Sequence, residues 1–346
     1  MVADDQPRES QFLVPDLNDA SMFTQDAHIR AVMNWDYGTK FPRLSDLYEK
    51  NKVSQWNVSS DIDWNYDVKF GVPADEHGRS MAPFAASPDS PVPRELWDVF
   101  RWEYQAWMVN QFLHGEQGAL LTTARLVETV PDMAAKFYAA SQVADEARHV
   151  EAYARYINEK LRVSYPINHG LKALLRDLLA DSRWDVVYLG MQVIVEGLAL
   201  AATRIASAGF SDPIISAITK MIARDEARHV SFGIITLDGL YDEISSQEFG
   251  EREEFLLEAI HLMSQRFLLR EIWEKMDLDV AKGTYFAKTD PTMVSFRQLL
   301  FRKVIQILRQ INLLTPKIRN LMLSEALALP QAFSGTADLR SLREPL

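Results

Sequence analysis

Cysteine is absent from this chain. Disulfides, thiolate zinc sites, cysteine-ligated iron–sulfur clusters and cysteine nucleophiles are therefore excluded together. Any metal that the sequence binds must be held by carboxylate, imidazole or neutral oxygen, and only seven histidines are available. The absence of cysteine also fits a reducing compartment.

Excess basic charge and long apolar runs are lacking as well. The 346 residues include 37 Lys+Arg against 48 Asp+Glu, a net charge of −11, which argues against a nucleic-acid binder or a polybasic membrane anchor. No run of eighteen uncharged apolar residues occurs, and the acidic start at residues 1–9 does not have the pattern of a signal peptide. We therefore expect a soluble, cytoplasmic protein that binds neither nucleic acid nor membrane.

The distribution of proline divides the chain into three parts. Eight of the fifteen prolines fall at or before Pro93, and we interpret residues 1–92 as an extended N-terminal arm that packs on the core. One short helix is expected in the arm, at 44–52. From Pro93 helical patterns dominate and strand-like alternation is scarce, so we predict an all-α fold. Residues 93–241 would form a four-helix bundle, and 242–346 additional C-terminal helices of the same domain.

Capping residues and prolines set the expected helix limits. Pro93 begins a helix of about 35 residues that ends before Pro131, and Asp132 caps a second helix to about residue 161. The later helices are expected at 171–208 with a break near Asp181, 213–241, 249–276, 291–314 and 316–328.

A five-residue motif, Asp-Glu-Ala-Arg-His, occurs twice, at 145–149 and at 225–229. The same offset of 80 residues relates Glu116 to Glu196, each lying 30 residues before the glutamate of its motif. Three further pairs obey the offset: Ala119 with Ala199, Leu120 with Leu200, and Thr123 with Thr203. The sequence therefore predicts two similar helix pairs.

The motif places acidic and imidazole groups in an apolar interior. Its glutamate and histidine are three residues apart and share one face of a helix, where their neighbours are largely apolar. Buried carboxylates repel one another and cost several kcal/mol each unless cations neutralise them. Two glutamates with two Glu-x-x-His pairs are the ligand set of a di-iron or di-manganese helix bundle. The predicted metal ligands are Glu116, Glu146, His149, Glu196, Glu226 and His229.

The other charged residues of the motif have two interpretations. Asp145 and Asp225 are either solvated or, as we favour, each accepts the outer imidazole N–H of the other motif's histidine. Arg148 and Arg228 are either exposed or paired with those aspartates. His114 lies on a different face from Glu116, and we interpret it as a packed or surface histidine.

These motifs resemble those of the ferritin-like di-iron carboxylate superfamily, in the branch of ribonucleotide reductase small subunits, bacterial multicomponent monooxygenases and arylamine N-oxygenases. The similarity covers about residues 93–240 and implies a ferritin-like four-helix bundle. It implies one metal on Glu116, Glu146 and His149. It implies a second metal on Glu196, Glu226 and His229, with Glu146 bridging and Glu226 able to shift.

The chain departs from each relative at particular positions. Tyr153 falls where reductase small subunits keep a radical tyrosine; it is either such a catalytic residue or an aromatic lining the cavity. Leu200 stands where the hydroxylases carry threonine, and Ile222 where the N-oxygenases carry a third histidine. Residues 341–346 lack the tyrosine that small subunits use for radical transfer.

The resemblance implies an O2-dependent di-iron monooxygenase or oxidase that hydroxylates, N-oxygenates or desaturates a small organic substrate. The expected cofactor is two Fe ions, with Mn or a mixed Mn/Fe pair as alternatives, and an electron-donor protein such as a ferredoxin or reductase is implied. Alternative functions are a radical-generating oxidase and a ferritin-like iron oxidation or storage protein. The expected substrate-pocket residues are Phe112, Ala119, Gln192, Val193, Ala199 and Leu200.

Two of these assignments have a structural alternative. Gln192 either contacts the substrate or is a buried structural amide. The aromatic face of the first long helix, with Trp102, Trp107 and Phe112, either forms a homodimer interface or is ordinary core.

Overall fold

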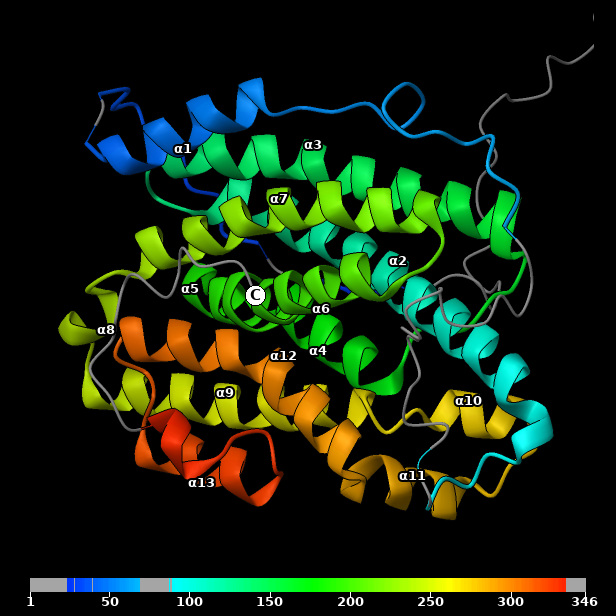
Figure 1. Cartoon of the computed structure of the whole chain (residues 1–346). Helices are drawn as coiled ribbons and strands as arrows, with labels where there is room; N and C mark the ends of the chain where they lie inside the picture. Colours follow the sequence, from blue (N-terminus) through cyan, green and yellow to red (C-terminus); the bar gives the residue numbers. More distant parts are fainter. Residues whose placement is uncertain (1–23, 28, 39, 69–86, 88, 334–346) are drawn as a thin grey trace, which may run out of the picture.

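The computed structural model describes residues 24–27, 29–38, 40–68, 87 and 89–333, and every regular element in these ranges is helical. The prediction of an all-α fold is thereby confirmed. Four long stretches form the central bundle (Figure 1). They are α2 (Trp97–Thr129), α3 (Met133–Tyr156), the continuous α5–η4–α6 (Trp184–Tyr188, Leu189–Val195, Glu196–Gly209) and α7 (Pro213–Leu237).

Further helices cover two opposite sides of the bundle. Helix α1 (Pro42–Val53) lies along α3 and α7, at the top of Figure 1. On the other side, α12 (Pro291–Gln310) packs on α6, α4 (His169–Ala180) on α2, and α9 (Ser246–Arg266) on α4. The remaining elements are η2 (Arg94–Leu96), η3 (Ile157–Leu161), α8 (Leu240–Glu243), α10 (Arg270–Lys275), α11 (Val280–Thr289), α13 (Pro316–Ser324) and η5 (Pro330–Phe333).

Side-chain caps explain where the bundle helices begin. Asp132 accepts hydrogen bonds from the backbone N–H groups of Ala134 and Ala135 at 2.8 and 3.1 Å, and so starts α3. Asp212 directly precedes Pro213, the first residue of α7, and accepts a hydrogen bond from the N–H of Ile214 at 2.8 Å. Such caps satisfy N–H groups that have no partner within the helix. The start of α3 could be read from the sequence because of Asp132, and that of α7 because of Pro213.

Most predicted helices are present, with one correction and one omission. The expected short helix at 44–52 lies within α1, and the expected break near Asp181 separates α4 from α5. The prediction of one helix over 249–276 is wrong, because the chain turns at Leu269, whose φ of 58° no α-helix accommodates. Helix α11 was not predicted.

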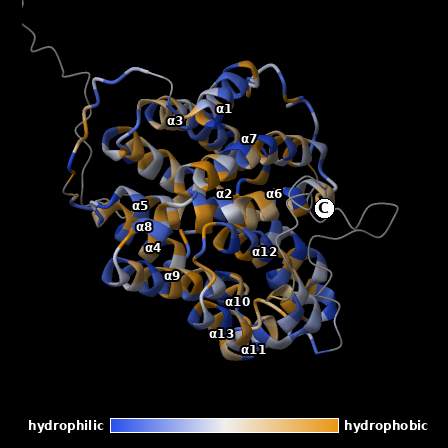
Figure 2. Ribbon diagram, turned by 90° about the vertical axis from the view of Figure 1, so that its left-hand side faces the viewer, coloured by the Kyte–Doolittle hydropathy of each residue, from blue (hydrophilic) through white to orange (hydrophobic). Residues whose placement is uncertain are grey.

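The third long stretch of the bundle is mostly buried. The stretch Trp184–Gly209 is long and apolar enough to cross a membrane, but 89% of its most apolar window is buried inside the protein. That is the burial of a core helix. In Figure 2 hydrophobic colours are frequent along α6, whereas α1 is largely hydrophilic.

One close helix crossing fixes the part of the bundle next to the site. A Cβ atom on Gly233 of α7 would lie only 2.7 Å from the Cβ of Gln192, so the two backbones approach as closely as they do because residue 233 has no side chain. Gln192 belongs to η4, a seven-residue π-helical segment that ends directly before Glu196. Such segments are frequent at functional sites because they re-aim the following side chains.

Candidate metal centre

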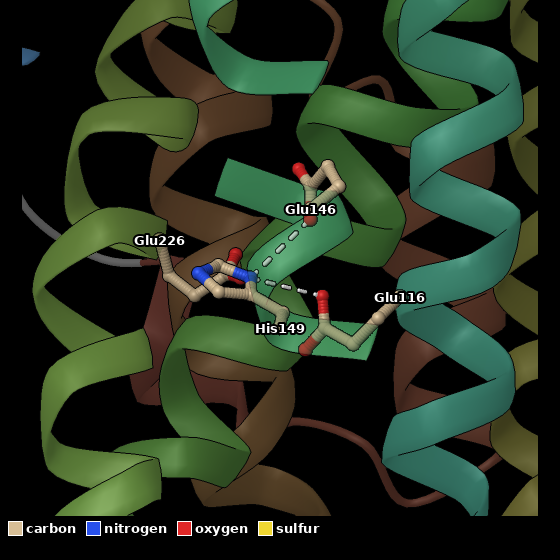
Figure 3. Close-up of side chains that lie close together, drawn as sticks. All are labelled: Glu116, Glu146, His149 and Glu226. Carbon is tan, nitrogen blue, oxygen red and sulfur yellow. Dashed lines mark hydrogen bonds and ion pairs between the residues drawn. The ribbon is translucent and has the colours of Figure 1, made fainter. Parts of the chain in front are cut away.

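Six buried side chains from all four bundle stretches meet inside the protein. In the described part of the chain, two groups have ligand atoms that all lie within 4.8 Å of one another. The first group contains Glu116, Glu146, His149 and Glu226, and is drawn in Figure 3. The second contains Glu146, Glu196 and His229. These are the six residues that the repeat singled out, and Glu146 belongs to both groups.

Each imidazole turns its Nδ1 atom toward three carboxylates. His149 Nδ1 lies 3.2 Å from Glu116, 3.4 Å from Glu146 and 3.6 Å from Glu226. His229 Nδ1 lies 3.2 Å from Glu146, 3.6 Å from Glu196 and 3.7 Å from Glu226. Glu146 and Glu226 are therefore near both histidines. Glu116 lies near His149, and Glu196 lies near His229. Glu146 thus lies where a bridging ligand would lie, and the ability of Glu226 to shift stays a prediction.

Without cations, the buried carboxylates of this cluster repel one another. Burial, with the negative charge of Glu196 added, raises the pKa of Glu146 to about 8. Burial and the same neighbour raise the pKa of Glu226 well above its usual range. Although burial acts in the opposite direction, the surrounding carboxylates hold the pKa values of His149 and His229 well above their usual range.

Several polar atoms of the cluster have no hydrogen-bond partner among the described residues. They are Glu146 Oε2, both carboxylate oxygens of Glu226, and His229 Nδ1. A buried polar atom left unpaired costs about 1–3 kcal/mol, and a carboxylate–imidazole set suits hard divalent ions. The donor set therefore fits a metal pair, which would use the unpaired atoms.

The outer nitrogen of each imidazole contacts an aspartate of the opposite helix. His149 Nε2 lies 3.0 Å from Asp225 Oδ2, and His229 Nε2 lies 3.3 Å from Asp145 Oδ2. This is the crossed arrangement expected from the sequence. An acceptor at the outer nitrogen fixes the ring orientation and leaves Nδ1 free to bind a metal.

The arginines of both motifs pair with these aspartates. Arg148 donates to Asp145 and Arg228 to Asp225 within their own helices, and Arg148 also lies 3.5 Å from Asp225. Two arginines thus compensate two buried aspartates. Despite burial, the hydrogen bond with the histidine opposite lowers the pKa of Asp145 and of Asp225.

Sequence reasoning missed the contribution of the N-terminal segment. Trp56 Nε1 donates to Asp225 at 2.8 Å, and its ring stacks on His149 with centroids 6.4 Å apart. Gln55 Nε2 donates to Asp145 at 2.9 Å. Both aspartates therefore receive a donor from the segment that follows α1. No periodicity could have indicated this, because the contacts bridge 90 and 169 residues of sequence.

Gln142 was also missed, although it lies one turn before Glu146 on the same face. Its Nε2 donates to Glu146 at 2.9 Å and to Glu196 at 3.1 Å, and so connects α3 to α6. Gln192 donates to the Gln142 carbonyl oxygen at 3.2 Å. Of the two interpretations of Gln192, this contact favours the buried structural amide.

A cavity of about 60 Å³ borders the cluster. Glu116 and Glu196 form part of its wall, together with Phe112, Ala119 and Ala199 from the expected substrate pocket. Three other expected pocket residues are buried but do not line this cavity: Gln192, Val193 and Leu200.

Tyr153 is buried beside the cluster, with its ring 5.5 Å from that of Phe112. Its hydroxyl has no hydrogen-bond partner among the described residues. Burial raises the pKa of Tyr153 well above its usual range, and the charges of Glu116 and Glu226 add to this effect. The phenol is therefore neutral and close to the carboxylates.

The remaining residues singled out from the sequence lie apart from the centre. His114 contacts the backbone oxygen of Tyr165 at 2.9 Å, and belongs to neither metal-ligand group. Trp107 is buried, lines the cavity and donates to Glu271 at 3.2 Å, which is a core role. The C-terminal residues 341–346 lie outside the described residues.

Fold and site together define a helical bundle with a buried carboxylate–imidazole centre able to hold metal. No protein-family model and no curated protein matches the chain.

Its structural neighbours are R2-like ligand-binding oxidases. One is a point mutant with a non-activated Mn/Mn cofactor, at 19% identity and a TM-score of 0.48 over 79% of this chain and 94% of that one. A second point mutant, with an anaerobically reconstituted Mn/Fe cofactor, has 20% identity and a TM-score of 0.45 over 80% of this chain and 93% of that one. Another neighbour, with an aerobically reconstituted Mn/Fe cofactor, has 19% identity and a TM-score of 0.41 over 84% of this chain and 92% of that one. At such values the function must be argued from the residues of this chain.

Proposed function

We propose that this protein is a non-haem di-iron oxidoreductase, or a manganese–iron equivalent, that uses O2 to oxidise a small organic substrate. The observation that carries the proposal is the cluster itself. Four buried glutamates and two buried histidines converge, and each histidine Nδ1 faces three carboxylate oxygens within 3.7 Å. A structural role would not require four buried carboxylates, two of which have unpaired oxygens.

The division of labour between metals and protein follows from the contacts. When bound, the metal pair would supply the electrons and Lewis acidity for O2 chemistry. Glu116, Glu146 and His149 would hold one ion, and Glu196, Glu226 and His229 the other. Asp225 and Asp145 keep the imidazoles oriented.

Two further groups of residues complete the proposed site. Gln142 fixes one oxygen each of Glu146 and Glu196 by hydrogen bonds. The apolar wall around Phe112, Ala119 and Ala199 keeps bulk water from the reacting centre and receives the substrate. Whether the substrate is hydroxylated, N-oxygenated or desaturated depends on its own structure.

The proposal includes partners that complete the reaction. Repeated turnover needs electrons from outside the chain, so a ferredoxin or a reductase is part of the proposed function. We further propose a cytoplasmic homodimer, as the sequence led us to expect.

A radical-generating oxidase is the second candidate, and Tyr153 is the observation in its favour. The phenol is buried next to the cluster and has no hydrogen-bond partner among the described residues. An oxidised tyrosine in that position would be shielded from solvent. A stable tyrosyl-radical spectrum after iron and oxygen addition would favour this candidate over substrate oxidation.

The test is anaerobic loading of the full chain with Fe(II), metal quantification, and then exposure to oxygen under optical observation. Wild-type protein should take up two ions per chain and develop absorption on oxygenation. Glu116→Ala and Glu226→Ala should lower the uptake, whereas Glu151→Ala should not, because Glu151 is exposed on the outer face of α3. Uptake that is unchanged in the first two variants would refute the metal centre. Cage-sized particles in light scattering would point to iron storage instead.

A further inference from the structure

The cavity beside the metal centre contains a second charged group, which the proposed chemistry does not use. Its wall is mostly apolar, with side chains such as Trp107, Met191 and Phe296. Glu116 and Glu196 contribute acidic groups from the metal cluster. Arg266, the last residue of α9, is the one basic residue in the part of the wall that the structure describes.

Arg266 is poorly satisfied by the protein. A guanidinium has five N–H donors, yet among the described residues Arg266 makes one hydrogen bond, to the backbone oxygen of Gln111 at 3.3 Å. The Nε donor is buried and has no partner among the described residues. Burial lowers the pKa of Arg266 to about 10, with the charge of Glu271 acting against the decrease. The side chain therefore stays cationic at neutral pH.

Helix α2 gives the axial offset between the backbone positions beside the two charged groups. Arg266 is anchored at Gln111, and Glu116 follows five residues later on the same helix. A rise of 1.5 Å per residue places these two levels about 7.5 Å apart along the axis. A single aromatic ring or a short alkyl chain covers such a distance.

We propose that the cavity binds a monocarboxylate, with its acid group on Arg266 and its opposite end facing Glu116 and Glu196. This substrate class rests on the proposed function, since the end facing the cluster is the one that would be oxidised. A guanidinium fork matches a carboxylate by paired hydrogen bonds, and Arg266 has the free donors. Arg266 is the one cationic side chain on the described part of the wall, and so it sets the direction of binding.

The cavity also limits the size and charge of the ligand. Its volume of about 60 Å³ is below the roughly 150 Å³ that accommodates benzene in a rigid apolar cavity. The flexible side chains of Met108 and Met191 on its wall can make room for a slim ligand. One guanidinium neutralises a single negative charge, which favours a carboxylate over a dianionic phosphate. The structure thus points first to short straight-chain acids, whereas a single-ring acid fits only after the two methionine side chains have moved.

The experiment is titration calorimetry of the full-length chain with hexanoate and benzoate. Hexanol and benzyl alcohol are the neutral controls. Each ligand is titrated into metal-free protein and into protein loaded anaerobically with Fe(II). The variants are Arg266→Gln, Arg266→Lys and the control Arg270→Gln, whose side chain is 69% exposed and pairs with Glu274 on the surface.

Wild-type protein should bind each acid more tightly than the matching alcohol. Arg266→Gln should weaken acid binding roughly ten- to hundredfold and leave alcohol binding unchanged. Arg266→Lys should fall between, because an ammonium keeps the charge and loses the fork. Arg270→Gln should behave as wild type.

Two results would overturn the proposal. One is unchanged acid binding in Arg266→Gln. The other is acid binding that requires the metals and ignores residue 266, which would place the acid group on the ions. If thermal melting shows that Arg266→Gln does not fold, the test relies on Arg266→Lys and on the preference of the wild-type protein for acid over alcohol. Equal affinity of the wild-type protein for acid and alcohol contradicts the inference. Failure of the proposed function would show separately, as absent metal uptake.

Discussion

The crossed contacts between aspartate and histidine make a prediction specific to each half of the metal centre. Asp225 Oδ2 accepts from His149 Nε2 at 3.0 Å and from Trp56 at 2.8 Å, while Arg228 occupies the other oxygen. In Asp225→Asn one of the two oxygens becomes an NH2 donor, so either the imidazole and indole or the guanidinium loses its acceptor. If the NH2 group faces the imidazole, His149 loses its acceptor; if the amide oxygen faces it, His149 keeps only a neutral and weaker acceptor. In both cases His149 is held less firmly, although every metal ligand remains in place.

The expected magnitude can be worked out. Loss of an orienting partner weakens metal binding about 10–100-fold, which corresponds to about 1.4–2.7 kcal/mol. Unfolding entropy of about 2.1 cal/mol/K per residue gives about 0.7 kcal/mol/K for 346 residues. The part of the melting temperature that depends on metal should therefore fall by about 2–4 °C at fixed excess metal.

A double-mutant cycle assigns the effect to one imidazole. Metal affinity is measured by competition titration in wild-type, His149→Gln and His229→Gln backgrounds. Asp225→Asn should have little further effect in the His149 variant and its full effect in the His229 variant. Asp145→Asn should show the reverse pattern. Equal effects of Asp225→Asn in both backgrounds would refute the crossed orientation.

Three further predictions concern packing and the neighbourhood of the site. Gly233→Ala should lower the free energy of unfolding in urea by about 1–3 kcal/mol, because its Cβ would meet another helix at 2.7 Å. Gly250→Ala should be neutral or stabilising, because no described atom outside its own stretch of helix lies within 4 Å of its Cβ. Equal effects of the two substitutions would contradict the close crossing. Arg252→Ala breaks two hydrogen bonds to Asp185, at 2.9 and 3.1 Å, and should cost about 3–5 kcal/mol; a loss under 1 kcal/mol in the same assay would count against a buried pair. Tyr153→Phe removes an unpaired buried hydroxyl and should leave the melting temperature equal or higher; a marked decrease would reveal a partner for that hydroxyl.

The ligand set was predictable because it depends on local spacing. Glu146 and His149 share a helix face through their separation of three residues, and the 80-residue repeat pointed to Glu196 and Glu226. Capping by Asp132 and the proline at position 213 located helix starts for the same reason. Such signals lie within one turn of a helix and do not depend on the rest of the fold.

The parts that were missed depend on contacts distant in sequence. Trp56 and Gln55 reach the motif aspartates from an aperiodic segment, and a carboxylate does not reveal which donor it will receive. Arg266 resembled any basic residue at a helix end until the fold placed it on the cavity wall. The turn at Leu269 was missed because leucine rarely adopts a positive φ, and no glycine marks it.

Asp145 and Asp225 each contact the histidine of the other half of the repeat, so the two halves depend on one another. Each half, taken alone, has an imidazole without its acceptor and an acceptor without its imidazole. Neither aspartate can be replaced independently during evolution, because its replacement removes the acceptor of the histidine in the other half. A helix pair of this kind becomes chemically complete only beside a second copy, so two such units related by a twofold axis would already contain both orienting contacts of the present single chain.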